Sequence, residues 1–136
     1  MVRWCRRGFF AAGVAAYLLG LLVLVASPWG WELNRLTVAL YVHLRSDWPI
    51  APHWVLPEHY GVLLNVVLFV PLGALAVLAT ARPWWWVTAG SALASVAIEL
   101  VQWRWLARDG SSGDVIANTL GALVGALVVT LRGRLR

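Results

Sequence analysis

Polar and charged side chains gather in one stretch of a chain that is otherwise strongly apolar. Residues 98–121, IELVQWRWLARDGSSGDVIANTLG, contain two arginines, three carboxylates, a glutamine and an asparagine. Carboxylates are common general acids and bases, and an arginine guanidinium binds phosphate or carboxylate through two parallel hydrogen bonds. The stretch could therefore act on a substrate or hold a polar ligand, depending on where the surrounding elements place these groups.

The composition of the chain indicates an integral membrane protein. Its 136 residues are 61% hydrophobic and only 12% charged, and the mean hydropathy is +0.75. We expect a single domain over residues 1–136. The formal net charge of +5 comes from arginines that cluster at the two termini, a pattern that fits membrane orientation better than nucleic-acid binding. The lone Cys5 excludes an intramolecular disulfide.

Four apolar runs approach the length of about 20 residues that a helix needs to cross a bilayer. The runs extend over about residues 9–26, 62–80, 84–103 and 115–131. Within them, Glu99 is the only acidic residue. The sequence therefore predicts an all-α membrane protein, a bundle of four transmembrane helices. Between the first two runs, residues 31–44 place four leucines near one helical face, which predicts a short interfacial helix in the first outer loop.

The distribution of arginines predicts the orientation, because cytoplasmic segments are enriched in positive charge. With the N-terminus inside, the cytoplasmic arginines are Arg3, Arg6, Arg7, Arg82, Arg132, Arg134 and Arg136. The outward arginines are then Arg35, Arg45, Arg104 and Arg108, and the acidic residues also face outward. We expect a multi-pass protein of the cell membrane, N-in/C-in, with both termini cytoplasmic.

The intramembrane polar residues fall in one shallow layer near the predicted outer surface. The layer is expected within about 6 Å of that surface, from the helical rise of 1.5 Å per residue. Ser95, Glu99 and Gln102 share one helical face of the third run, and Asp114 and Asn118 share one at the start of the fourth. On the second run, Asn65 lies on a face that is otherwise apolar. We expect these faces to meet, because an amide or carboxylate facing lipid would cost a few kcal/mol. The residues of this layer, with Asp114 at its edge, are Asn65, Glu99, Gln102, Asp114 and Asn118.

Small residues and a proline lie below the polar layer. Gly121 and Gly125 form a GxxxG pair on the face of Asn118, which allows another helix to approach closely. Pro71 removes a backbone hydrogen bond from the second apolar run, and Gly73 eases the resulting bend. We expect these four residues to serve helix packing.

Several residues permit two interpretations. Glu99 could be clamped by Arg104 or Arg108, or it could take part in ligand or proton binding. Asp114 follows a Ser-Ser-Gly turn, where it could cap the last helix or bind a ligand. Ser95 has no histidine near it in sequence to activate it, and Ser111 and Ser112 lie in a predicted flexible turn, so we assign no catalytic residue. The histidines His43, His53 and His59 lack a metal-ligand spacing, and we expect no metal or cofactor.

Three segments together resemble the VanZ-like family of small bacterial membrane proteins. They are NVVLFVPLG at 65–73, SVAIELVQ at 95–102 and RDGSSGDVIANTLGALVG at 108–125. The pattern is N-x3-F-x-P-x-G, then S-x3-E-x2-Q, then an arginine followed by D-x3-N-x2-G and a further glycine. The family is named for a membrane protein associated with resistance to teicoplanin, a glycopeptide antibiotic. The resemblance thus implies a role in the cell envelope and adds Phe69, Ser95 and Arg108 to the residues of interest.

These observations favour a non-enzymatic module whose outward polar cluster binds a lipid-linked envelope precursor or a lipoglycopeptide. The candidate ligand-binding residues are Asn65, Glu99, Gln102, Arg108, Asp114 and Asn118. Two alternatives stay open: a membrane enzyme that uses Glu99 or Asp114 as acid or base, and a purely structural accessory subunit. Membrane lipids are expected partners, and nucleic acid is not.

Overall fold

The structure, a computed structural model, is built from helices. It describes residues 2–26, 30–50, 52, 54–105 and 111–134, without the side chains of residues 2–10, 25, 26, 30, 31 and 33. The helices are α1 (Val2–Ala26), α2 (Gly30–Val42), α3 (Pro57–Thr80), α4 (Trp84–Trp105) and α5 (Ser112–Arg134), with a π-helical turn η1 (His43–Asp47) after α2. Within these ranges there is no β-strand, so the predicted all-α class is confirmed.

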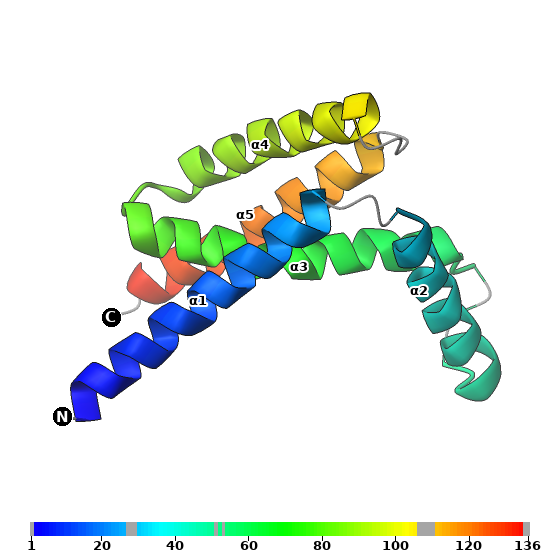
Figure 1. Ribbon diagram of the computed structural model, residues 1–136, viewed down its shortest axis with the longest axis horizontal. Helices are drawn as coiled ribbons and strands as arrows, with labels where there is room; N and C mark the ends of the chain where they lie inside the picture. The colour runs from blue at the N-terminus through cyan, green and yellow to red at the C-terminus, as the bar shows by residue number, and fades with distance from the viewer. Residues whose placement is uncertain (1, 27–29, 51, 53, 106–110, 135–136) are drawn as a thin grey trace.

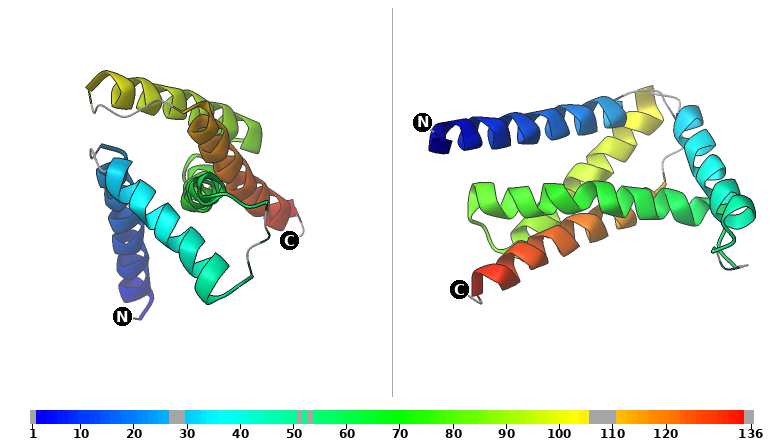
Figure 2. Two further views of the ribbon diagram at one scale, coloured as in Figure 1. Left: turned by 90° about the vertical axis from the view of Figure 1, so that its right-hand side faces the viewer. Right: turned by 90° about the horizontal axis from the view of Figure 1, so that it is seen from below.

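Helices α3, α4 and α5 form the centre of the molecule, and α1 crosses one side of it (Figure 1). Helix α2 stands at a steep angle to α3, at the end where α3 begins. Figure 2 shows that both chain termini lie at the opposite end of the bundle. The last turn of α4 and the first turn of α5 lie at the same end as α2. The polar stretch of the sequence is therefore at the end remote from the two termini.

Three of the predicted membrane spans coincide with α3, α4 and α5. Each of these helices is long and apolar enough to cross a bilayer, with 24, 22 and 23 residues respectively. In α1 the described apolar part is shorter, Ala11–Leu24. A fourth crossing and the orientation of the termini stay predictions. Helix α3 begins at Pro57, five residues before the predicted start, because proline suits the first helical turn and the Leu56 N–H donates to His59 Nδ1 at 2.9 Å.

The helix predicted over residues 31–44 is present as α2 and continues into η1. It is joined to α3 by an edge-to-face contact between the rings of Tyr41 and Tyr60, whose centroids are 6.3 Å apart. Its Glu32 and Arg35 form an exposed ion pair at 3.5 Å. The helical prediction is confirmed, and its place at a membrane interface remains an expectation.

The backbones of α3 and α5 approach closely because both helices carry small residues where they meet. A Cβ atom added to Gly121 would overlap the carbonyl oxygen of Val66, and one added to Gly125 would overlap that of Val70. On the α3 side, a Cβ at Gly73 would overlap the carbonyl of α5. The alanines at this depth on α5 are fully buried: Ala117, Ala122 and Ala126. The three glycines thus lie where the two backbones come closest, and their role in helix packing stays a prediction.

Helix α1 is linked to α3 beside the helix proline. The Tyr17 hydroxyl donates to the Leu68 carbonyl at 2.7 Å, three residues before Pro71, which lies inside α3. Because proline has no N–H, Pro71 leaves the Val67 carbonyl without its helical donor, and the carbonyl that Tyr17 reaches is the next one along the chain. None of the described α1 side chains is buried, so α1 is a peripheral helix.

The turn from α3 to α4 is short and sharply bent. Helix α3 ends at Thr80, and Ala81 has a left-handed backbone (φ 52°) whose N–H donates to the Val77 carbonyl at 2.9 Å. The Arg82 N–H donates to Thr80 Oγ1 at 3.3 Å. These bonds hold Arg82 at the end of the bundle near the chain termini.

We expect the Gly125→Ala variant to lose stability, because the new methyl group would meet the α3 backbone, which cannot move aside as a side chain can. The loss should be about 1–3 kcal/mol, read as a lower midpoint of thermal unfolding in detergent. Gly133→Ala is the matched control, since no atom lies within 4 Å of its added Cβ. Equal midpoints for the two variants would contradict the proposed close packing.

Candidate functional site

The polar residues of α3, α4 and α5 meet at the end of the bundle remote from the termini. We call Asn65, Ser95, Glu99, Gln102, Asp114 and Asn118 the polar cluster. The first link joins α3 to α5: Asn65 Nδ2 donates to Asp114 Oδ1 at 2.9 Å. Both side chains are half-buried. The predicted meeting of the α3 and α5 polar faces is therefore present.

The second link joins α4 to α5 in the interior. Asn118 Nδ2 donates to Ser95 Oγ at 2.9 Å, and the two residues expose only 5% and 0% of their surface. The other amide atom, Asn118 Oδ1, is buried and has no hydrogen-bond partner in the described part of the chain. An unpaired buried acceptor costs free energy, so this oxygen is an acceptor that a ligand or a water could satisfy.

Glu99 joins α4 to the start of α5. Its Oε2 accepts a hydrogen bond from the Ser111 backbone N–H at 2.8 Å, and its side chain is half-buried. Glu99 also takes part in a further interaction, and Arg104 is exposed. The other predicted partner, Arg108, lies outside the described residues. The bond from the Ser111 N–H therefore links α4 to the residue that precedes α5.

Asp114 lies within the first turn of α5, not at the capping position. Helix α5 begins at Ser112, three residues before Val115, where a cap at Asp114 requires it to begin. Its carboxylate is bonded to Asn65 on another helix, and a negative charge is also favourable in the first turn of a helix. The capping interpretation of Asp114 is thus wrong, because the Ser-Ser-Gly turn is already partly helical.

Gln102 completes the polar cluster. It is 5% exposed and lies on α4 one to two turns from Ser95, on the same face. The side chain is not free, since it takes part in a further interaction. Five of the six candidate ligand-binding residues are therefore brought together, and the sixth, Arg108, lies outside the described residues.

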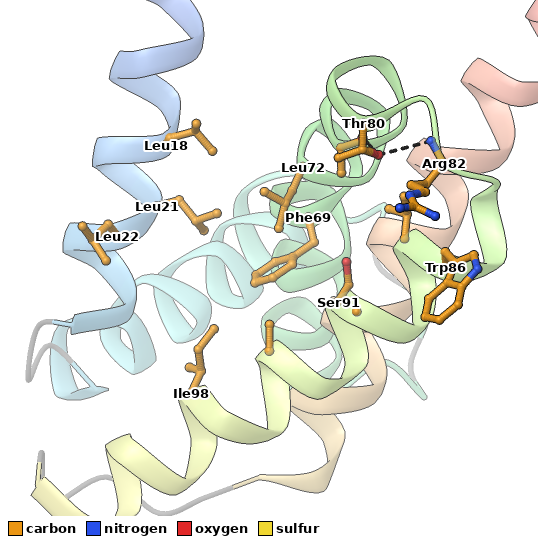
Figure 3. Close-up of a pocket in the computed structure, with 14 residues that line it drawn as sticks. Leu18, Leu21, Leu22, Phe69, Leu72, Thr80, Arg82, Trp86, Ser91 and Ile98 are labelled. Atoms are coloured by element: carbon orange, nitrogen blue, oxygen red, sulfur yellow. Dashed lines mark hydrogen bonds between the residues drawn. The ribbon is translucent and has the colours of Figure 1, made fainter.

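A second feature, an apolar cleft, lies between α1, α3 and α4 (Figure 3). It has a volume of about 760 Å³. Phe69 and Leu72 of α3 face Leu18 and Leu22 of α1 across it, and Arg82 stands at one end. The sequence interpretation missed this cleft. The available signal was a run of small residues on one side of α4, Gly90, Ser91 and Ala94, which leaves space beside the helix.

The histidines do not assemble a metal centre in the described part of the chain. His43 Nδ1 lies 2.8 Å from Asp47 Oδ2 in the exposed η1 turn. His59 accepts the hydrogen bond at the start of α3. His53 lies outside the described residues. The described histidines thus serve local structure at the end of the bundle where α2 lies.

We expect the Ser95–Asn118 bond to appear as a coupling in a double-mutant cycle. Ser95→Ala alone should cost about 1–3 kcal/mol, because it leaves a buried amide without its acceptor. Adding Asn118→Leu should recover part of this loss, because replacing both partners by apolar groups removes the unpaired groups. Thermal unfolding of the four proteins in detergent measures the coupling, which strictly additive losses would contradict.

Comparison with known proteins places the chain in a family. The sequence model of the VanZ/LLP1 family matches residues 13–133. This range contains the whole polar cluster and all residues that line the cleft. No curated protein and no solved structure matches the chain. Because the match covers nearly the whole sequence, the protein belongs to the VanZ/LLP1 family.

Proposed function

We propose that this protein is a non-enzymatic binding module of the bacterial cell envelope, and that its ligand is held at the polar cluster. The observation that carries the proposal is the concentration of hydrogen-bond acceptors at one end of the bundle. Two half-buried carboxylates, Glu99 and Asp114, accompany the buried and unpaired Asn118 Oδ1. A carboxylate has sites for about four hydrogen bonds, so Asp114 can accept more than the bond from Asn65.

The chemistry of the site indicates the class of ligand. A group of acceptors recognises donors: hydroxyl, amide N–H and ammonium groups. Sugars and peptides present many such donors, so a lipid-linked envelope precursor or a lipoglycopeptide fits the site. The aromatic rings near it are exposed, among them Trp103 and Trp105 at the end of α4, and tryptophan favours the membrane–water interface. Such a ligand could sit with its polar part at the cluster and its hydrocarbon part in the bilayer.

The family is named for a protein associated with teicoplanin resistance, and this gives the proposed binding a biological context. A protein that holds a lipoglycopeptide, or its envelope target, at the outer surface would change how much antibiotic reaches that target. We therefore propose that the chain contributes to glycopeptide resistance. Arg108, with its planar guanidinium, would suit a carboxylate or phosphate of the ligand.

The hydrogen bonds within the polar cluster favour a second candidate function, that of a structural accessory subunit. The bonds Asn65–Asp114, Asn118–Ser95 and Ser111–Glu99 each connect different helices or a helix and its hairpin. In this case the polar residues would only fix the arrangement of α3, α4 and α5. The two candidates differ in what a conservative variant changes: ligand binding alone, or abundance and activity together.

We expect Asp114→Asn to weaken binding of teicoplanin by about tenfold, since a hydrogen bond to a charged group contributes about 1.5–3 kcal/mol. Binding would be measured by calorimetry on the full chain in lipid nanodiscs. Asparagine keeps an acceptor for Asn65, so the protein should remain folded. Arg104→Gln is the control, because Arg104 is exposed and lies outside the cluster.

The same variants in a susceptible host separate the two candidates. With protein levels equalised by quantitative blotting, Arg108→Ala and Asp114→Asn should lower the teicoplanin concentration that the cells tolerate to the level without the protein. If these variants fall in abundance and protection together, the structural role holds instead. Unchanged protection at equal abundance would overturn the binding proposal.

A further inference from the structure

We propose that the apolar cleft binds one acyl chain of an anionic phospholipid, whose phosphate pairs with Arg82. The cleft lies between α1, α3 and α4, and no residue of the polar cluster lines it. The mouth of the cleft, at Thr80 and Arg82, lies at the other end of the helices from the polar cluster, and the proposal goes beyond the function proposed above. Three observations support it: the length of the cleft, the residues at its mouth and the distribution of charge.

The length of the cleft matches one leaflet of a bilayer. Along α4 its lining runs from Trp86 to Ile98, a rise of about 18 Å at 1.5 Å per helical residue. Half of a hydrocarbon core of about 30 Å is about 15 Å. The cleft walls are apolar apart from Ser91 and the residues at the mouth. An acyl chain that starts at the mouth would therefore end near the bilayer midplane.

The mouth of the cleft carries a cation and groups suited to a membrane interface. Thr80, Arg82 and Trp86 lie together there (Figure 3). Arg82 is exposed, and the described ion pairs do not include it. The left-handed Ala81 and the bond from the Arg82 N–H to Thr80 Oγ1 fix the turn from which the guanidinium extends. A guanidinium in this place can bind a lipid phosphate through two parallel hydrogen bonds.

The charge of this end of the bundle favours an anionic headgroup over a neutral one. Arg132 and Arg134 lie in the last turn of α5, and the C-terminus is at the same end as the α3–α4 turn (Figure 1). The described acidic residues all belong to α2, η1, the start of α3, the α4 segment near the α5 hairpin or the first turn of α5. A negative headgroup therefore meets cations here without a competing carboxylate among the described residues.

An ordinary phospholipid fits the cleft better than a polyprenyl phosphate, because the cleft is only as deep as one leaflet. The test uses the full chain purified in mild detergent. It is mixed with equal amounts of phosphatidylglycerol and phosphatidylcholine that carry identical acyl chains, and bound lipids are counted by native mass spectrometry. We expect one retained lipid, with about fivefold preference for phosphatidylglycerol. One arginine near an anionic lipid surface contributes about 1 kcal/mol to binding, which corresponds to a ratio of about five between the two lipids.

Arg82→Gln should abolish this preference, so that the two lipids are retained in a ratio of about one. The control is Arg132→Gln, which removes an exposed arginine outside the cleft and should leave most of the preference.

A second pair of variants tests the cleft itself. Gly90 lines the cleft and Gly20 does not, and no atom lies within 4 Å of a Cβ added to either. Gly90→Leu should therefore lower retention of both lipids, while Gly20→Leu should not.

Unfolding midpoints equal to that of the parent chain confirm that these variants fold. Equal retention of the two lipids by the parent chain, or an unchanged preference in Arg82→Gln, would overturn the proposal. Tighter retention of a polyprenyl phosphate than of phosphatidylglycerol, in the same competition format, would overturn the choice of occupant. Loss of teicoplanin binding through Asp114→Asn would leave these outcomes unaffected, so the two proposals can fail separately.

Discussion

The close approach of the α3 and α5 backbones is the constraint on which the rest of the structure depends. In a bilayer, burial of apolar surface does not drive helices together, because lipid tails are as apolar as leucine. What remains is van der Waals contact and hydrogen bonding, and both require short distances. Gly73, Gly121 and Gly125 provide these distances, since any side chain there would meet the opposite backbone.

The polar cluster follows from this approach. Asn65 reaches Asp114 because their helices are held together about two to three turns further along by the glycines. Asn118 lies on the same face of α5 as Gly121 and Gly125, and it meets Ser95 from the other neighbour, α4. The amides and carboxylates therefore contact each other, and the cost of placing them in lipid is avoided. Packing and polar contacts are two parts of one interface.

The parts of the fold that follow from helical periodicity could be predicted from the sequence. The shared face of Asp114, Asn118, Gly121 and Gly125 is a property of the chain alone, and it correctly indicated which side of α5 is buried. The start of α3 at Pro57 was not predicted, because the residues before position 62 include Glu58 and His59 and so interrupt the apolar run. The cleft was also missed. The small residues on α4 indicate room beside that helix, but the shape of the space also depends on the path of α1 across the bundle, which no local pattern specifies.

The weak attachment of α1 bears on how a lipid chain can enter the cleft from the membrane. Among the described residues, one hydrogen bond joins α1 to the rest of the molecule, from the Tyr17 hydroxyl to the Leu68 carbonyl. No described side chain of α1 is buried. Interhelical bonds of this kind contribute on average about 0.6 kcal/mol, which is close to thermal energy. One wall of the cleft can thus move sideways at little cost, so a hydrocarbon chain can enter from the surrounding bilayer without passing through water.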